Sequence, residues 1–446
     1  MRRKILKVAW ISSESSRKGK LLSNSLPCGI FIIMVKPNFL FLWAASFLLA
    51  LTFTQPLGAQ GRDIRLPEIV SPGQRDTALR LYIQSPDSAM RSLAQRAFRT
   101  HGGFRLVESA SEAQFIFQFA PGANAREVRL SIATGRPPEV RHRSTERGTS
   151  ARNALLRAAD RAVVLTTRQP GYFSSQLAFV GQRGGAREIF VSDLLLGEVR
   201  QLTSDGSDSV SPRWSPDGTR LLYTGYFQSG FPDIFMIDLA NRQRDATVTL
   251  QGTNSGARFS PDGNQIAMVL TGEGNAEVYV SNARGRNIRR LTRTNSVQSS
   301  PAWSPDGRQI VFTSDRMGSP QLYVMNNDGT GVRRLPTNIS RYCAEPDWNP
   351  VHRNQIAFTA AVAGRFAIAL YDMETRESRF LTPGPADAVH PRWLPDGRHI
   401  IFTERTATTK VLSILDTQSP ERQRVKITPL HRSSAGRFSM PDVVRP

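Results

Sequence analysis

Apolar and polar residues alternate over stretches of about five positions throughout residues 168–446, and Gly, Pro, Asn and Asp separate the stretches. Alternation with a period of two, bounded by turn-forming residues, predicts short β-strands joined by tight turns. Residues 309–313 (Gln-Ile-Val-Phe-Thr) and 321–325 (Gln-Leu-Tyr-Val-Met) are two such stretches. This part of the chain is therefore expected to be mainly β-structure.

The strand pattern repeats, and each copy places a large apolar residue before a Ser-Pro-Asp-Gly turn or a variant of it. The anchors are Trp214, Phe259, Trp303, Trp348 and Trp393, at spacings of 45, 44, 45 and 45 residues. A period near 45 with several strands per unit predicts a β-propeller, whose four-stranded blades bury their faces against one another. The strand after the turn recurs six times, which predicts six blades, with copies at Leu177, Leu221, Ile266, Ile310, Ile356 and Ile400.

The end of the chain carries a further copy of the repeat. One more step of 45 residues from Trp393 arrives at Phe438, while the first blade, near Leu177, has no such anchor ahead of it. We expect the C-terminal residues to supply the inner strand of the first blade, because this closure removes an unpaired sheet edge. The anchors are expected to pack between blades, and turn carboxylates such as Asp217 to cap their own loops.

Residues 76–167 follow a different pattern, which predicts a small α/β domain. Strands are expected at 79–83, 104–107, 114–119 and 128–132, and helices at 87–99 and 151–164, where apolar residues fall on one helical face. Residues 60–75 contain Pro and Gly without periodicity and are expected to form a flexible arm. The six-bladed propeller then occupies residues 168–446.

An apolar run of 15 residues at 39–53 precedes these parts of the chain. Lys36 lies before the run and Leu57-Gly-Ala59 after it, and the run is short for a membrane span. This order is typical of a Sec-type signal peptide, so we interpret residues 1–59 as a leader cleaved after Ala59. We favour Met34 as the true start, and we expect no stable membrane insertion after cleavage.

The net charge is strongly positive but dispersed. It is +21 for the whole chain, and the first 59 residues contribute +7 of it through eight Lys or Arg and one Glu, which leaves +14. No basic stripe with interleaved aromatic residues occurs, so nucleic-acid binding is not expected. Attraction to an anionic partner or surface remains open. Cys28 in the leader and Cys343 in the propeller allow no internal disulfide in the exported form.

The sequence contains no recognisable catalytic or metal-binding motif. It lacks a Gly-x-Ser-x-Gly elbow, a Gly-rich phosphate loop, His-Glu-x-x-His and Cys-x-x-Cys, and none of its six histidines pairs at metal-ligand spacing. We therefore predict no catalytic residue, cofactor or metal. The loops that enter the inner strands differ between blades and are the better candidates for partner binding. They are residues 207–211, 252–255, 296–300, 342–345 and 386–390.

The region around the first blade resembles the TolB family, the periplasmic component of the Tol-Pal system. The resemblance rests on Val164-Leu-Thr-Thr, Tyr172-Phe-Ser-Ser-Gln-Leu-Ala-Phe-Val180 and Ser211-Pro-Arg-Trp-Ser-Pro-Asp-Gly218, in that order. The C-terminal Phe438-Ser-Met-Pro also resembles the Trp-Ser-Pro ending of that family. The resemblance to this family implies a mainly β protein, with a six-bladed propeller that is preceded by a small α/β domain and closed by the C-terminal strand.

The resemblance also implies a non-enzymatic adaptor in the periplasm. In that family the propeller mouth binds the peptidoglycan-associated lipoprotein Pal, the N-terminal segment communicates with TolA, and the system maintains the outer membrane and its constriction at cell division. Carried over by position, the Pal-facing loops correspond to Thr253 with Asn254, Gln298 with Ser299, and Ala344 with Glu345. His390, in the loop before the last Trp anchor, is a further candidate.

Two alternatives remain open from the sequence. One is an exported propeller enzyme related to oligosaccharide lyases or to prolyl oligopeptidase, and the other is a propeller that binds something else. A peptidase of that kind needs a hydrolase domain, for which we expect no room after the ring closure. A lyase needs His, Lys or Arg clustered with a metal at the channel.

Overall fold

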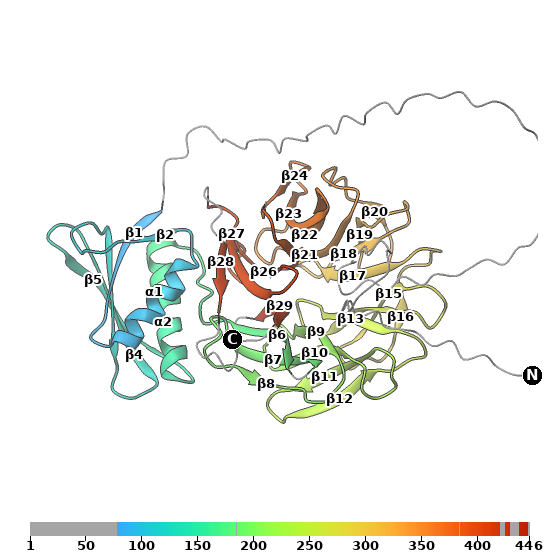
Figure 1. The fold of residues 1–446 in the computed structure, drawn as a ribbon, viewed down its shortest axis with the longest axis horizontal. Helices are drawn as coiled ribbons and strands as arrows, with labels where there is room; N and C mark the ends of the chain where they lie inside the picture. Colours follow the sequence, from blue (N-terminus) through green and yellow to red (C-terminus); the bar gives the residue numbers. More distant parts are fainter. Residues whose placement is uncertain (1–77, 184, 383, 420–423, 429–436, 445–446) are drawn as a thin grey trace, which may run out of the picture. The chain divides into compact units, whose positions relative to one another are not determined.

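The computed structural model describes residues 78–446 apart from 184, 383, 420–423, 429–436 and 445–446. The described residues belong to one compact unit, Gly73–Pro446. Its described part contains one five-stranded sheet with two helices, followed by six four-stranded sheets that form a propeller (Figure 1). The mainly β fold class is thereby confirmed. The predicted leader, its cleavage after Ala59 and the arm at 60–75 lie outside the described residues.

The α/β part has a mixed sheet in the order β2-β1-β3-β4-β5, with β1 parallel to β2 and β3 and the other pairs antiparallel. Its helices pack against each other and against the sheet. The predicted helices and four strands are present at the expected places. The elements are β1 (Leu79–Gln84), α1 (Ser88–Arg99), β2 (Phe104–Leu106), β3 (Phe115–Pro121), β4 (Glu127–Thr134), β5 (Glu139–Arg147) and α2 (Ala151–Thr167).

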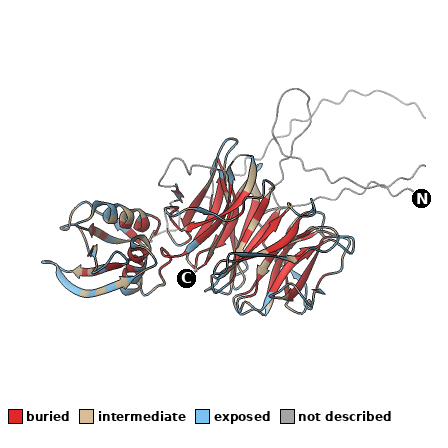
Figure 2. Cartoon of the chain, turned by 90° about the horizontal axis from the view of Figure 1, so that it is seen from below, coloured by how far each residue is buried: buried red, intermediate tan, exposed pale blue. Residues whose placement is uncertain are grey.

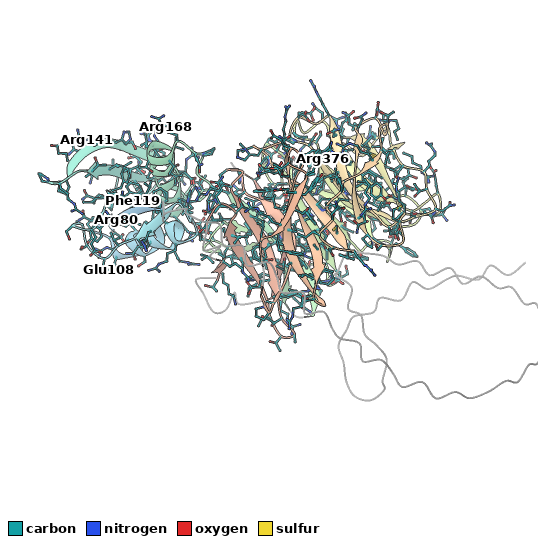
Figure 3. All side chains as sticks on the ribbon, turned by 90° about the horizontal axis from the view of Figure 1, so that it is seen from above. Arg80, Glu108, Phe119, Arg141, Arg168 and Arg376 are labelled. Carbon is teal, nitrogen blue, oxygen red and sulfur yellow. The ribbon has the colours of Figure 1, made fainter. Side chains whose placement is uncertain are left out.

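β5 was not predicted, because its side chains are mostly polar and alternate only between exposed and half-buried. Arg141 lies on this strand, where it forms an exposed ion pair with Glu139 (Figure 3). Surface ion pairs of this kind contribute little to stability. The strand is therefore held mainly by its backbone pairing with β4, which a hydrophobic pattern cannot reveal.

Both helices of the α/β part begin at capping residues. Asp87 accepts hydrogen bonds from the N–H groups of Ala89 and Met90 at the start of α1. Ser150 caps α2 by accepting the N–H group of Asn153, and α2 ends at Thr167, before Arg168, whose φ of 60° is left-handed (Figure 3). The caps fix where the two helices start and stop, and so how the chain leaves α2 for the propeller.

The propeller blades are antiparallel sheets whose strands are mostly buried (Figure 2). The first blade contains β6 (Gln176–Arg183), β7 (Ala186–Asp193), β8 (Arg200–Gln201) and the last strand, β29 (Arg437–Val444). The second blade contains β9 (Ser209–Trp214), β10 (Arg220–Gly225), β11 (Asp233–Asp238) and β12 (Gln243–Val248). The third blade contains β13 (Asn254–Phe259), β14 (Gln265–Leu270), β15 (Glu277–Asn282) and β16 (Arg289–Arg290). The fourth contains β17 (Gln298–Trp303), β18 (Gln309–Ser314), β19 (Gln321–Asn326) and β20 (Arg333–Arg334); the fifth, β21 (Cys343–Trp348), β22 (Gln355–Val362), β23 (Arg365–Asp372) and β24 (Glu377–Phe380); the sixth, β25 (Asp387–Trp393), β26 (His399–Arg405), β27 (Lys410–Asp416) and β28 (Arg424–Ile427).

The C-terminal strand closes the ring, because β29 pairs with β6 as the inner strand of the first blade. The predicted closure is confirmed, but the predicted anchor is wrong. Trp214 lies opposite Leu221 in the second blade, and the residue opposite Leu177 in the first blade is Val443, whereas Phe438 lies opposite Gly181. The interval from Trp393 to Val443 is 50 residues, five more than the repeat, so counting in steps of 45 selected the wrong residue.

The Ser-Pro-Asp-Gly turns are structural, as predicted. In each turn the Ser hydroxyl donates to the Asp carboxylate, and the carboxylate accepts the N–H group two residues later, as in Ser215, Asp217 and Thr219. The carboxylates of Asp262, Asp306 and Asp396 accept the N–H group two residues later in the same way, although the turn of Asp396 has Leu394 in place of the Ser. The Trp anchors are buried, and the indole N–H of Trp393 donates to the carbonyl of Asp347 in the neighbouring blade. These residues join and close the blades.

Candidate functional site: the propeller mouth, its central ring and the domain junction

Each inner strand bends at the same place near its start. Five non-glycine residues have positive φ there, and Gly256 occupies the position in β13; the five are Ser211 (φ 55°), Ser300 (51°), Glu345 (55°), His390 (55°) and Met440 (52°). The pairing with the second strand shifts register at this point in the blades, which is the mark of a β-bulge. Because positive φ is costly for residues other than glycine, the bulges are enforced by the blade structure.

The predicted partner-binding residues lie at the starts of the inner strands of neighbouring blades, but most are buried. Thr253 and Ser299 are half-buried, whereas Asn254, Gln298, Ala344, Glu345 and His390 are buried. The Asn254 amide donates to Asp233 and to the carbonyl of Leu250. The Gln298 amide donates to Thr294. These two side chains hold their own loops in shape. Their role in partner binding stays a prediction.

Glu345 and His390 connect two blades. One carboxylate oxygen of Glu345 lies 3.0 Å from His390 Nε2, and the other accepts the His390 N–H and the Thr359 hydroxyl. Burial alone raises the pKa of Glu345, but His390 and the hydrogen bonds from both partners outweigh it and lower the pKa to about 2. The carboxylate is therefore ionised at every physiological pH. The repeat spacing had singled out both residues.

A ring of side chains from equivalent strand positions lies two residues beyond each bulge. We call these the ring residues: Arg213, Arg258, Ala302, Asp347, Arg392 and Asp442. Asp347 Oδ1 lies 2.7 Å from Arg258 Nη1, although the two residues belong to blades that are not neighbours. Asp347 and Asp442 each also accept the backbone N–H of the Trp anchor in the next blade, at 2.8 Å. The ring thus joins the blades across the centre of the propeller.

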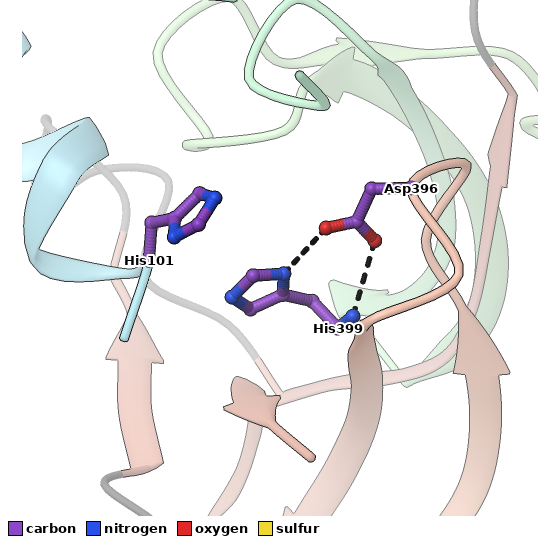
Figure 4. A group of neighbouring side chains, drawn as sticks. All are labelled: His101, Asp396 and His399. Carbon is purple, nitrogen blue, oxygen red and sulfur yellow. Dashed lines mark hydrogen bonds and ion pairs between the residues drawn. The ribbon is translucent and has the colours of Figure 1, made fainter. Parts of the chain in front are cut away.

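A buried polar cluster joins the α/β part to the sixth blade (Figure 4). We define the junction cluster as His101, Asp396, His399 and Asp416. His399 Nδ1 lies 2.5 Å from Asp396 and its Nε2 lies 3.3 Å from Asp416. His101, from the turn after α1, packs its ring against that of His399 at 4.6 Å between centroids. Arg398 donates three hydrogen bonds to Asp416, from Nε to both carboxylate oxygens and from Nη2 to one of them, so that oppositely charged groups alternate through the cluster.

The α1–β2 turn approaches the sixth blade closely enough to require glycine. A Cβ atom on Gly102 would lie 2.4 Å from an oxygen of Asp416, so any other residue there would displace the Asp416 carboxylate. Tyr172, in the connection to the first blade, donates its hydroxyl to the carbonyl of Thr100 at 2.9 Å. Phe173 beside it packs on Phe98 of α1, with 5.1 Å between ring centroids. One apolar core therefore runs from the α/β part into the first and sixth blades.

The junction cluster also has ligand atoms at metal-binding distances. One atom from each of His101, Asp396 and His399 lies within 4.8 Å of the others. However, the two carboxylates raise the pKa of His399 to about 9 despite its burial, so the imidazole is protonated at neutral pH. The protonated imidazole lies between the two carboxylates, so the cluster is an ion network that holds the two parts together.

We expect the stability of this chain to be greatest near pH 6.5 and to fall on both sides. The folded pKa of His399 is raised above its unfolded value of about 6.5, so its contribution is complete below pH 6.5 and is lost as pH rises to about 9. Burial lowers the pKa of His101 well below 6.5, so the contribution of His101 is lost as pH falls below 6.5. The pKa values of Asp396 and Asp416 are lowered in the folded protein. Their contribution to stability is therefore lost as the pH falls below about 4 and the carboxylates become protonated.

Chemical denaturation at pH 5 to 9 measures this profile. The His399→Gln variant should lose the fall between pH 6.5 and 9, which amounts to roughly 2–3 kcal/mol. The matching substitution of exposed His352 should leave the profile unchanged. If the free energy of unfolding of His399→Gln still falls between pH 6.5 and 9, the fall does not come from titration of His399.

A basic cleft adjoins the junction. Its volume is about 620 Å³, and β2 and β28 contribute to its walls. The cationic side chains that line it are Arg99, Arg105, Arg398, Arg424 and Lys426. Arg398 is engaged by Asp416, so this cation is already balanced within the fold.

Neither helix among the described residues is long and apolar enough to cross a membrane.

Comparison with known proteins accounts for the architecture. The TolB beta propeller domain matches residues 164–434, which is more than half of the chain. The chain belongs to this family. The curated relatives include the Tol-Pal system protein TolB of Anaeromyxobacter dehalogenans, 36% identical over 183 residues, or 41% of each chain. The TolB homolog of Chlorobium luteolum is 30% identical over 213 residues, which cover 48% of this chain and 45% of the relative.

The matched region thus spans less than half of the length of these curated TolB relatives. Among solved structures, the crystal structure of TolB from Acinetobacter baumannii aligns with a TM-score of 0.73 and 22% identity. The alignment covers 83% of this chain and 98% of that TolB chain, so the similarity of fold includes the α/β part.

Two groups of functional candidates were missed in the sequence. Each ring residue directly precedes the anchor position of its blade. The repeat therefore contained the information, because this position differs between blades whereas the anchor is nearly always a large apolar residue. The junction cluster had no such signal, because His101 and His399 are almost 300 residues apart and belong to no shared motif.

Proposed function

We propose that this chain is a non-enzymatic adaptor of the Tol-Pal system in the periplasm, and that it binds Pal through the mouth of its propeller. It thereby helps to maintain the outer membrane and its constriction during cell division. The observation that carries the proposal is the match of the TolB beta propeller domain to residues 164–434. The names of the relatives in Anaeromyxobacter and Chlorobium support the same system.

The form of the mouth supports a docking role. The loops before β13, β17 and β21 differ in sequence, while buried hydrogen bonds from Asn254 and Gln298 fix their shapes. A surface that is already ordered loses little conformational entropy on binding, which favours affinity. The half-buried side chains of Thr253 and Ser299 are the groups that a partner reaches there. The same proposal assigns a TolA contact to residues 60–75, which lie outside the described residues.

The test is the affinity of residues 60–446 for the organism's own Pal periplasmic domain, measured by calorimetry. We expect saturable binding, which Thr253→Arg or Ser299→Arg weakens at least tenfold, because a bulky charge enters the contact. Asn264→Arg is the matched control, since Asn264 is exposed in the turn at the other end of the third blade. A folded propeller that does not bind at high micromolar Pal would refute the proposal.

A further inference from the structure

The ring residues form a charged layer that the protein itself does not balance. The layer contains three arginines, two aspartates and one alanine: Arg213, Arg258, Arg392, Asp347, Asp442 and Ala302. The nearest other carboxylate along β21, Glu345, is already engaged by Thr359 and His390. The ring layer therefore carries one more guanidinium than it has carboxylates.

The hydrogen bonds within the layer leave two arginines poorly paired. Each aspartate uses one oxygen to accept a Trp N–H group, so only the other oxygen faces the arginines. Arg258 takes the Asp347 oxygen at 2.7 Å, and Arg392 lies 3.7 Å from that oxygen and 3.5 Å from Asp442. The last two distances are too long for normal charge-assisted hydrogen bonds. Arg258 is thus the one ring arginine with a short ion pair in the described part of the chain.

Arg392 and Arg213 hold the excess charge. The Arg392 side chain is 6% exposed, and its Nε is buried without a hydrogen-bond partner. Across residues 78–446, apart from the gaps named above, Arg213 forms no ion pair within 4 Å, and it donates to the carbonyl of Pro212. A buried donor without a partner, such as Arg392 Nε, is costly. Arg213 is half-buried, so its charge is only partly screened by water. These two side chains therefore favour an additional negative group.

The pKa shifts of the ring residues agree with an excess of positive charge at Arg213 and Arg392. Burial, and then the charges of the neighbouring arginines, lower the pKa values of Arg213 and Arg392, the latter to about 10. Arg392 nevertheless remains protonated at neutral pH. Burial raises the pKa of Asp442, which weakens its ability to act as a counter-charge.

We propose that the ring layer is a binding site for one carboxylate group, held by Arg213 and Arg392, whose blades lie on either side of the blade that carries Asp442. The planar guanidinium of arginine matches the two oxygens of a carboxylate, and a single negative charge neutralises the layer. The carboxylate belongs either to a small free acid or to an acidic side chain of a protein that enters the channel. The site is independent of whether Pal is the partner.

Substitution of Ala302 can supply the third carboxylate that the ring layer lacks. Ala302 occupies the position that Asp347 and Asp442 occupy in their blades, where each accepts the N–H of the next Trp anchor. In Ala302→Asp the new carboxylate would add the missing negative charge to the layer, in the blade between those of Arg258 and Asp347. The variant is therefore expected to bind no added carboxylate.

The experiment is thermal unfolding of residues 60–446 in sodium formate, compared with sodium chloride at equal ionic strength. We expect formate to raise the unfolding midpoint of the wild type saturably, by several degrees, beyond the effect of chloride. Ala302→Asp and Arg213→Gln should lose this dependence, and the control Arg242→Gln, at an exposed turn residue, should retain it. If Ala302→Asp does not fold, Arg213→Gln alone decides the result.

Two outcomes overturn the proposal: a wild-type midpoint that responds equally to formate and chloride, and a formate effect that survives in Arg213→Gln. The source of the carboxylate is distinguished with N-acetyl-aspartyl-N′-methylamide, which carries the carboxylate on a peptide. Saturation at a lower concentration than formate assigns the site to an acidic protein side chain, and saturation at an equal or higher concentration assigns it to a free acid.

Discussion

Deletion of residues 437–446 is expected to leave the chain without a closed propeller, so that it is unfolded or aggregated at 25 °C. The deletion removes β29, which pairs with β6 and buries Phe438, Met440 and Val444. Burial of each of these side chains contributes about 1.5–3 kcal/mol, and the loss also exposes the edge of β6. The sum is comparable with the total stability of a domain, about 5–15 kcal/mol.

Circular dichroism during heating and size-exclusion chromatography measure this effect. Removal of Arg445 and Pro446 alone is the control, because β29 ends at Val444. The control should change the free energy of unfolding by less than about 0.5 kcal/mol. A chain without residues 437–446 that remains monomeric and unfolds cooperatively within a few degrees of the wild type contradicts the closure by β29.

His399→Ala is expected to lower the free energy of unfolding by about 3–5 kcal/mol, because it leaves the carboxylates of Asp396 and Asp416 facing each other without the cation between them. The side chain of His399 is fully buried, so water cannot replace it without rearrangement of the junction. Since His101 packs on the same ring, the α/β part should also separate from the sixth blade more readily.

Urea denaturation at pH 6.5 gives the change in free energy, and limited proteolysis between α2 and β6 reports the separation. His352→Ala, at an exposed position, should have no measurable effect on either. A loss of less than 1 kcal/mol in His399→Ala would show that the junction cluster does not hold the two parts together.

The repeat made the propeller predictable, because the same turn recurs in most blades and its Ser, Asp and Gly each have a local role. Ring closure was also predictable, but its register was not. The interval between Trp393 and β29 is longer than the repeat, which moves Val443 into the anchor position, and this extra length leaves no mark in the spacing of the tryptophans. The strand β5 escaped prediction because its stability lies in backbone pairing with β4 rather than in buried side chains.

The candidate site was predictable only in part, because the repeat gives the positions of the loops but not the directions of their side chains. The loop positions followed from the period, so the sequence located the starts of the inner strands correctly. Whether a side chain there faces outward depends on the bulge, which turns Glu345 and His390 toward each other. The pairing of Arg258 with Asp347 across the ring, and of His399 with His101 across the junction, depends on tertiary contacts that no local pattern encodes.

Docking of a partner on the end of the propeller where the inner strands begin can be measured by hydrogen–deuterium exchange of residues 60–446, with and without the Pal periplasmic domain. We expect Pal to slow exchange in residues 252–255, 296–300 and 342–345, and to leave the turns at 215–218 and 260–263 unchanged. Protection confined to those turns, or no protection in the loops at a saturating concentration of Pal, would contradict this docking.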